Sequence, residues 1–515
     1  MNRKLTFLPF LLLAQCSWAQ LSIDSSAVRF SKTINKSELR EHLEILASDA
    51  YEGRETGKEG QKKSAIYLAA QFEAAGIKPW KNSWYQAFDL LEKTPKGNIT
   101  VNGHTFNFGK EFYFFPGFSD TVITAGEVVF LGYGIDDKKY SDYQVDVKGR
   151  VIIILDGEPV DKKGNFLVSG NKNASDWTHD VRRKINVAKD KGVGAMLVIK
   201  NNFDISLTML SHFINSPSVE LKNQPKEQGR KRLHAFFISP EMTEKIIKQK
   251  EINKIKSKIA STGKTVTKVL SAAIEISMSR TSTELSSENV IAFIEGTDKK
   301  EEVLVLTAHY DHLGKEGTEV YNGADDDGSG TVALIEIAEA FCEAVKNGKR
   351  PRRSILIMPV SGEEKGLLGS FYYSENPVFP IEHTIANLNI DMIGRSDTAH
   401  KNNPEYVYII GSDMLSNDLH HISEEVNKNY SDVKLDYTYN SVDDPNRYYY
   451  RSDHYNFAKK NIPVIFYFTG VHEDYHKPTD EVSKIDFEKM EKITRMIFLT
   501  AWELANREER PQLKK

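Results

Sequence analysis

The chain has 515 residues, of which 40% are hydrophobic and 27% are charged. This composition is ordinary for globular proteins, and it excludes a wholly disordered, collagen-like or coiled-coil protein. The formal net charge is −4, so the chain has no basic excess to neutralise phosphates, and we expect no nucleic acid partner. At about 100–200 residues per domain, the length predicts two to four domains.

The first residues differ from the rest of the chain. A short basic segment, residues 2–4, precedes the apolar run of residues 5–14, and the small residues Ser17 and Ala19 follow. This pattern predicts a cleaved signal peptide over residues 1–19, and therefore export to the periplasm or the extracellular space. A lipid anchor at Cys16 is the less favoured alternative, because Gln15 is a poor residue to precede a modified cysteine. No later stretch approaches 18 consecutive apolar residues, so we expect no transmembrane segment in the mature chain.

Two helices are predicted at the start of the mature chain. Apolar side chains recur at helical spacing in residues 39–46 and again in residues 65–72. Asn35 and Glu38 have the spacing of a capping box before the first helix. Gly76 stands where a glycine commonly ends a helix.

The middle of the chain is rich in short β-type runs. We expect strands at residues 127–135, 151–155 and 195–199, with a helix over residues 180–191. Residues 201–268 are polar and rich in lysine, and their periodicity is weak apart from a helical patch near Ile246.

From residue 288 onward, apolar strands alternate with amphipathic helices. The predicted strands are 303–307, 355–360, 385–390, 406–411 and 464–468, and the clearest helices are 331–345 and 487–504. Continuous apolar strands between helices indicate an α/β domain with a buried, mainly parallel sheet. Chemistry in such sheets lies beyond the carboxyl ends of the strands.

Histidine and carboxylate side chains follow four of these predicted strands. His309 follows the first, Glu363 and Glu364 follow the second, Asp391 follows the third, and His476 lies beyond the last. Crowded carboxylates repel one another unless cations hold them, and mixed histidine and carboxylate ligands suit Zn²⁺. Of two adjacent glutamates, one can bind metal while the other transfers protons.

A second zinc motif competes for the same region. Residues 472–476 formally match H-E-x-x-H, which binds a single zinc ion when both histidines lie on one face of a helix. Gly470 precedes this segment and Pro478 follows it, directly after a predicted strand. Hardly one helical turn fits there, so the single-zinc interpretation is disfavoured.

Six segments occur in the order found in a known family: AHYDHLG (308–314), NGADDDGSG (322–330), SGEEKGLLGS (361–370), NIDMIG (389–394), RSDHYNFA (451–458) and YHKPTDE (475–481). They resemble the co-catalytic di-zinc exopeptidases, which include the bacterial leucyl aminopeptidases and the glutamate carboxypeptidases. The early segment HLEILASDAYEGRETGKEGQ (42–61) also resembles this family. The middle of the chain is similar to the protease-associated insert of many relatives.

The resemblance implies two zinc ions per chain. It assigns His309 and Asp391 to the first ion and Glu364 and His476 to the second, with an aspartate bridging them. The implied bridge is Asp326, although spacing alone does not separate it from its neighbours Asp325 and Asp327.

The same resemblance implies roles around the ions. Glu363 is the general base, and Tyr475 polarises the scissile carbonyl. Asp311 orients His309, and Asp480 orients His476. The substrate pocket is lined by Tyr449, Arg451 and Ser452.

These inferences together predict an exported zinc-dependent exopeptidase that acts on peptides. An aminopeptidase is favoured; a carboxypeptidase or dipeptidase on the same centre, a glutaminyl cyclase-like enzyme and an inactive binding module are alternatives. The expected fold is a mainly parallel, mixed α/β/α zinc-exopeptidase domain interrupted by a smaller β-rich protease-associated domain. We expect the catalytic domain over residues 30–116 and 285–507, and the insert over residues 117–284. The oligomeric state does not follow from the sequence.

Overall fold

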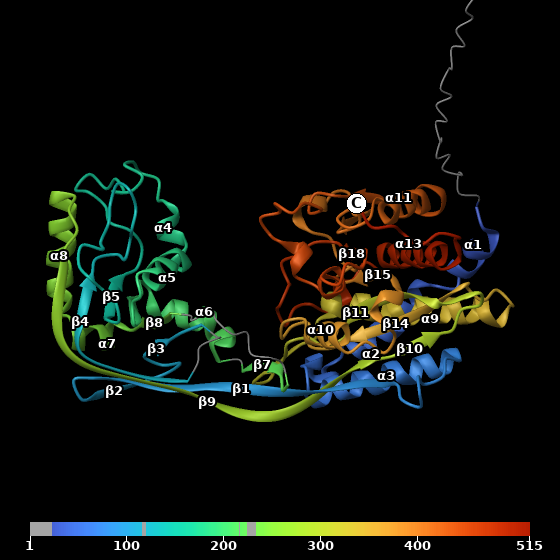
Figure 1. Cartoon of the computed structure of the whole chain (residues 1–515), viewed down its shortest axis with the longest axis horizontal. Helices are drawn as coiled ribbons and strands as arrows, with labels where there is room; N and C mark the ends of the chain where they lie inside the picture. The colour runs from blue at the N-terminus through green and yellow to red at the C-terminus, as the bar shows by residue number, and fades with distance from the viewer. Residues whose placement is uncertain (1–22, 116–119, 216, 224–232, 515) are drawn as a thin grey trace, which may run out of the picture. The chain divides into compact units, whose positions relative to one another are not determined.

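The computed structural model describes residues 23–115, 120–215, 217–223 and 233–514 (Figure 1). The predicted signal peptide and Cys16 lie outside these residues. The described residues form two compact units, one from those within residues 1–88 and 287–515 and the other from those within residues 89–286. No helix among the described residues combines the length and the apolar content needed to cross a bilayer.

The first unit is built on a seven-stranded sheet. Its strand order is β10 (Ala292–Ile294), β14 (Arg353–Val360), β11 (Lys299–His309), β15 (Thr384–Ile390), β18 (Val464–Phe468), β16 (Tyr406–Ile410) and β17 (Lys434–Asp436). Four neighbouring pairs are parallel, while β10 with β14 and β16 with β18 are antiparallel. The five predicted strands are all present, and the prediction of a mainly parallel, mixed sheet is confirmed.

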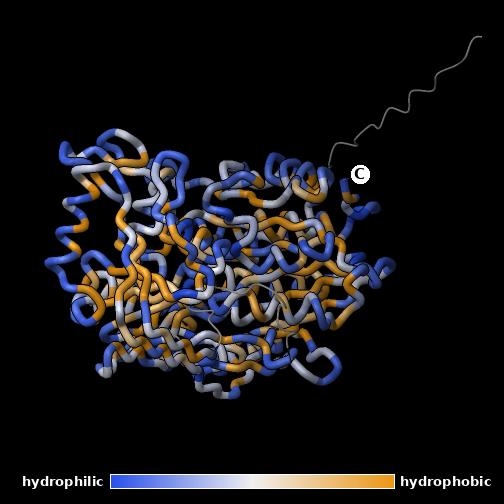
Figure 2. The backbone as a smooth tube through the Cα atoms, turned by 60° about the vertical axis from the view of Figure 1, so that its left-hand side comes forward, coloured by the Kyte–Doolittle hydropathy of each residue, from blue (hydrophilic) through white to orange (hydrophobic). Residues whose placement is uncertain are grey.

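Helices cover both faces of this sheet. One face packs against α1 (Ser25–Ser31), α2 (Lys36–Leu46), α3 (Glu59–Ala75), α9 (Gly330–Lys346), α11 (Asn417–Val426) and α13 (Phe487–Asn506). The other face packs against α10 (Leu368–Glu375) and α12 (His454–Ala458). Alternate residues of β11 serve the two cores, with Leu304 in the first and Val305 in the second. Figure 2 shows that hydrophobic segments run through the interior, whereas the outer loops are mostly hydrophilic.

The predicted helix ends agree with the observed ones. The side chain of Asn35 accepts hydrogen bonds from the backbone N–H groups of Ser37 and Glu38, as an N-cap does. Gly76 follows α3 with a φ of 102° and donates its N–H to Glu73 and Phe72. That positive φ is the reason a glycine stands at this position.

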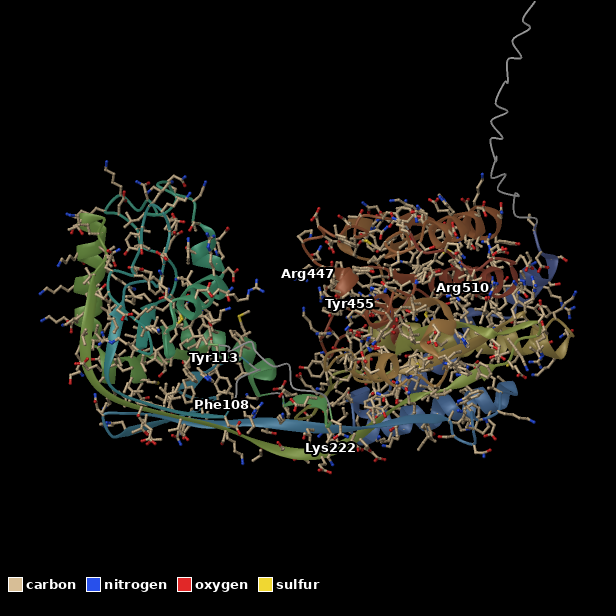
Figure 3. All side chains as sticks on the ribbon, in the orientation of Figure 1. Phe108, Tyr113, Lys222, Arg447, Tyr455 and Arg510 are labelled. Carbon is tan, nitrogen blue, oxygen red and sulfur yellow. The ribbon has the colours of Figure 1, made fainter. Side chains whose placement is uncertain are left out.

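The second unit has a nine-stranded sheet of its own. The strands are β1 (Tyr85–Val101), β2 (His104–Asn107), β3 (Phe112–Tyr113), β4 (Thr121–Leu131), β5 (Val151–Leu155), β6 (Ala195–Ile199), β7 (Ser218–Leu221), β8 (His234–Ile238) and β9 (Thr267–Val290). Five helices accompany them: α4 (Asp176–His179), α5 (Val181–Asp190), α6 (Phe203–Asn215), α7 (Pro240–Ile246) and α8 (Gln249–Thr262). Aromatic residues pack on the sheet; Tyr113, labelled in Figure 3, stacks on Phe237 at 4.9 Å.

The boundaries of the second unit differ from the expected ones. It begins at Asp89, not at residue 117, and ends at Ser286, within two residues of the expected end. The cause is that β1 pairs with β2 and β7 and β3 pairs with β8, so residues before 117 belong to this sheet. In β1, buried and exposed positions alternate irregularly among lysines and threonines, and the strand has no continuous apolar run.

Candidate metal centre

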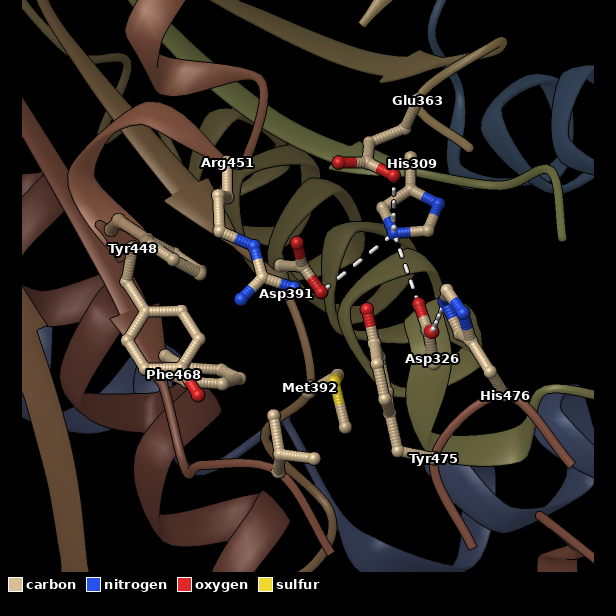
Figure 4. Close-up of a pocket in the computed structure, with 12 residues that line it drawn as sticks. His309, Asp326, Glu363, Asp391, Met392, Tyr448, Arg451, Phe468, Tyr475 and His476 are labelled. Carbon is tan, nitrogen blue, oxygen red and sulfur yellow. Dashed lines mark ion pairs between the residues drawn. The ribbon is translucent and has the colours of Figure 1, made fainter. Parts of the chain in front are cut away.

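Four neighbouring strands deliver the candidate ligands to one edge of the sheet. Strands β14, β11, β15 and β18 are parallel to one another, so their carboxyl ends lie together. His309 ends β11, Asp391 directly follows β15, and the loop after β18 carries His476. These residues and Asp326, from the loop before α9, surround one pocket (Figure 4).

Asp326 lies between two imidazoles. Its Oδ1 atom is 3.3 Å from Nε2 of His309, and its Oδ2 atom is 3.1 Å from Nε2 of His476. Asp391 Oδ1 lies 3.7 Å from the same nitrogen of His309, and Glu364 Oε2 lies 3.3 Å from that of His476. The donors therefore form two groups that share Asp326: His309 and Asp391 on one side, Glu364 and His476 on the other.

Two carboxylate oxygens of this cluster are buried without a hydrogen-bond partner in the part of the chain that the structure describes. These oxygens are Asp326 Oδ2 and Glu364 Oε1. Burying a charged oxygen without a partner costs several kcal/mol of folding free energy. A bound cation would offset this cost by its attraction to the oxygen. Donors around a tetrahedral ion with bonds of about 2.0–2.1 Å lie roughly 3.3 Å apart, which is close to the separations above. The residues present thus fit divalent metal ions, and nitrogen with oxygen donors suits zinc.

The structure separates the three successive aspartates by their partners. Asp327 accepts backbone N–H groups from three residues, His309, Gly330 and Met392, so both its oxygens are used within the fold. Asp325 accepts the N–H of Gly394 through Oδ1, and its Oδ2 lies 3.3 Å from Nε2 of His472. Only Asp326 of the three faces both His309 and His476, in the part of the chain that the structure describes.

Glu363 stands beside the first group of donors. Its Oε2 atom is 3.9 Å from Nε2 of His309, and its side chain is 13% exposed. Burial raises the pKa of Glu363 well above the usual carboxyl range, and the neighbouring charges of Glu364 and Asp391 raise it further. A carboxylate with a raised pKa is a competent proton acceptor near neutral pH.

Asp311 contacts His309 through its backbone and not through its carboxylate. The Nδ1 atom of His309 donates to the carbonyl oxygen of Asp311 at 3.0 Å, whereas the nearest carboxylate oxygen is 3.8 Å away. The carboxylate accepts the hydroxyl of Thr56 at 2.6 Å and the backbone N–H of Glu363 at 3.2 Å. The carbonyl oxygen of Asp311 thus holds Nδ1 of His309, and its carboxylate fixes the loop that carries Glu363 and Glu364.

Asp480 differs from its expected role. It accepts the backbone N–H groups of Asp325 and Asp326, and no bond from it to His476 is present among the described residues. The turn over residues 477–480, in which Asp480 donates its N–H to Lys477, directs its side chain toward the loop before α9. Asp480 thus holds the backbone of Asp326 in place.

Arg54 supports the centre, and the sequence did not single it out. It is 1% exposed and donates to the carbonyl oxygens of Leu46, Tyr310, Asn322 and Gly323. Its guanidinium therefore ties the segment after β11 to the loop that leads to Asp326. An arginine before the first predicted strand gives no sign of this role unless the fold is known.

The expected substrate residues fall in different places. Arg451 and Tyr475 line the pocket, and Figure 4 shows the hydroxyl of Tyr475 directed toward the donors. Ser452 instead donates to Asp391 Oδ2 at 2.7 Å and so supports a candidate ligand. Tyr449 is buried against Tyr450 and His454, outside the pocket. Because residues 448–450 form a tight helical turn, successive side chains diverge, and Tyr448 takes the lining position instead.

The competing H-E-x-x-H segment is not helical. Residues 472–476 lie in turns after β18. His472 faces Asp325, whereas His476 faces Asp326 and Glu364. Glu473 is 80% exposed and lies 3.5 Å from Arg395. The two histidines therefore do not share one metal position, and the geometry disfavours a single zinc ion held by this motif.

Known proteins resemble this chain in sequence and in fold. Residues 289–501 match the model of Peptidase family M28. The fold is similar to that of an aminopeptidase from Aneurinibacillus sp. strain AM-1, with a TM-score of 0.57 and 18% identity; 94% of this chain and 97% of that chain are covered. A probable zinc metalloprotease from Pyricularia oryzae is 26% identical over 271 residues, 44% of this chain and 52% of that protein. The probable glutamate carboxypeptidase LAMP1 from Arabidopsis thaliana is 36% identical over 105 residues, 20% of this chain and 14% of that protein.

This chain spans about half or less of the length of these two curated relatives. Residues 289–501, which match the family model, nevertheless contain the whole cluster of candidate ligands, from His309 to His476. The resemblance noted in the sequence is thereby confirmed. Residues 289–501 of this chain are therefore similar in sequence to peptidase family M28.

Proposed function

We propose that this protein is an exported zinc-dependent exopeptidase that removes N-terminal residues from peptides. The observation that carries the proposal is the position of Asp326 between two groups of donors, with Glu363 beside them. One zinc ion would be held by His309, Asp326 and Asp391, and a second by Asp326, Glu364 and His476. Bound there, the ions would supply Lewis acidity toward the scissile carbonyl and lower the pKa of a water molecule.

The chain's own residues account for the proton transfers. Glu363 is the general base: it takes a proton from the attacking water and delivers it to the leaving amine. Tyr475 donates a hydrogen bond to the oxyanion that develops on the carbonyl. Burial raises the pKa of Tyr475, and nearby carboxylates including Asp326 raise it further. The hydroxyl therefore stays protonated and can donate this hydrogen bond. Ser452 holds the carboxylate of Asp391 at its place beside the pocket.

Two features of the pocket bear on which end of the peptide is recognised. Glu363 and Asp391 line it and would attract a free amino group, which favours an aminopeptidase. Arg451 also lines it, with its guanidinium 5.1 Å from the ring centre of Tyr448 and in no ion pair among the described residues. A guanidinium there would attract a substrate carboxylate, so a carboxypeptidase or dipeptidase is the second candidate.

A matched pair of substrates decides between these activities. A peptide with a free N-terminus and an amidated C-terminus tests aminopeptidase action, and an N-acetylated peptide with a free C-terminus tests carboxypeptidase action. Both are assayed with and without a chelator. We expect chelator-sensitive cleavage of the first peptide. Cleavage of the acetylated peptide alone would reverse the assignment, and cleavage of neither would contradict both aminopeptidase and carboxypeptidase action.

The second unit and the export signal belong to the same proposal. The similarity of segments such as VVFLGYGI (128–135) to protease-associated inserts supports a protease-associated role for residues 89–286. The basic and apolar pattern of residues 2–19 supports export. Edman sequencing of the mature protein tests the signal, with a start at Gln20 expected.

A further inference from the structure

We propose that His312 is a further ligand of the second metal ion, through its Nδ1 atom. The inference rests on the proposed two-metal centre and extends it. The second ion would then be held by two imidazoles and two carboxylates, those of His312, His476, Asp326 and Glu364. This would add a ligand to the set that the sequence predicts.

The ring of His312 lies beside two of the candidate ligands of the second ion. Nδ1 of His312 lies 2.9 Å from Glu364 Oε1 and 3.8 Å from Asp326 Oδ2. One donor atom from each of these three residues lies within 4.8 Å of the others. The distances are those of atoms around a shared ion, since donors of a tetrahedral site lie roughly 3.3 Å apart.

The imidazole of His312 is buried without a hydrogen bond among the described residues. The side chain of His312 is fully buried, and among the described residues neither ring nitrogen makes a hydrogen bond. Glu364 Oε1, the nearest acceptor, is likewise without a hydrogen bond despite its short distance to Nδ1. Buried polar atoms are rarely left without partners in folded proteins. A cation between them would satisfy the imidazole nitrogen and the carboxylate oxygen together.

Backbone contacts fix the position of His312. The N–H of His312 donates to the carbonyl oxygen of Arg54, and Glu55 pairs with His312 in a β-bridge. Gly323 leaves room for the ring: a Cβ atom at this glycine would lie 2.5 Å from Cγ and Cδ2 of His312. A side chain confined in this way has its orientation set before any ion binds, which is what a metal site requires.

The paramagnetic spectrum of the cobalt-substituted protein tests the proposal. In the full chain loaded with two equivalents of Co²⁺, each ligating imidazole contributes one strongly shifted, solvent-exchangeable N–H signal to the proton NMR spectrum. We expect three such signals, from His309, His312 and His476, and two in the His312→Gln variant. The His454→Gln variant is the matched control. His454 is also fully buried, and among the described residues neither of its ring nitrogens makes a hydrogen bond and no carboxylate forms an ion pair with it.

Stepwise titration with Co²⁺ provides the second readout. His312→Gln should lower the affinity for the second equivalent of Co²⁺ at least tenfold and leave the affinity for the first nearly unchanged. His454→Gln should change neither affinity. Two shifted signals in the wild-type protein with two bound ions would overturn the inference and leave the proposed function standing, even if His312→Gln fails to fold. Failure of the wild-type protein to bind cobalt at all would overturn both.

Discussion

Replacing Glu363 by Gln tests the assignment of the general base. The change keeps the shape of the side chain and removes its ability to accept a proton. Among the described residues, no hydrogen bond to its carboxylate is present; the loop is fixed by the backbone N–H of Glu363, which donates to Asp311 and is retained in the variant. The substitution should therefore act on the chemistry and leave the metal ligands in place.

The expected loss follows from the proton transfer that disappears. A positioned general base contributes about 10²–10⁴-fold to the rate, so kcat should fall at least a hundredfold, which corresponds to about 2.7 kcal/mol in the barrier. The assay is hydrolysis of an aminoacyl p-nitroanilide, with zinc measured in the same preparations by elemental analysis. Metal content should equal that of the wild-type protein.

Glu473→Gln is the control for this experiment. Glu473 is 80% exposed and would be the base only if residues 472–476 held a single zinc ion. Its replacement should change kcat less than twofold. Full activity in Glu363→Gln would refute the assignment of the base, and loss of activity in Glu473→Gln would instead restore the single-zinc interpretation.

Three further predictions concern the pocket, the metal and a buried carboxyl. Tyr475→Phe removes the hydroxyl directed toward the donors and should lower kcat roughly 100–1,000-fold with little change in KM, measured by steady-state kinetics; an unchanged kcat would show that the ring only packs. Chelation should lower Tm, because ligands that bind only the folded state stabilise it; added zinc should restore Tm, and a Tm insensitive to chelator would argue against a metal at these residues. Burial raises the pKa of Glu336 from 4.5 to about 8, so the folded state holds this proton more tightly than the unfolded state, and stability present below pH 4.5 is lost as pH rises through 8. Between pH 5 and pH 9, the free energy of unfolding of Glu336→Gln should therefore rise by roughly 2–4 kcal/mol relative to that of the wild type, measured by urea unfolding. A difference in unfolding free energy that does not vary with pH would contradict the raised pKa.

The part of the chain that carries the candidate metal centre is largely predictable because its sequence signals are local. Apolar runs such as 303–307 mark buried parallel strands, and the parallel arrangement brings their carboxyl ends together. His309, Glu364, Asp391 and His476 could therefore be placed near one another without a structure. Helix ends at Asn35 and Gly76 follow from the preferences of single residues for cap positions.

The remaining features depend on contacts that sequence spacing does not encode. The backbone N–H groups that occupy Asp327 come from three separate segments, so only the structure distinguishes it from Asp326. The same holds for Tyr448 and Tyr449, whose directions are set by one tight turn. The first boundary of the second unit was misplaced because β1 is recognisable only from the strands that pair with it.

The number and position of the bound metal ions test the central claim most directly. Crystals grown with zinc, measured on both sides of the zinc absorption edge, would show each ion as an anomalous peak. We expect two peaks that share Asp326 as a ligand, one beside His309 and Asp391 and the other beside Glu364 and His476. A single peak held by His472 and His476, or no peak in a protein that is fully active, would contradict it.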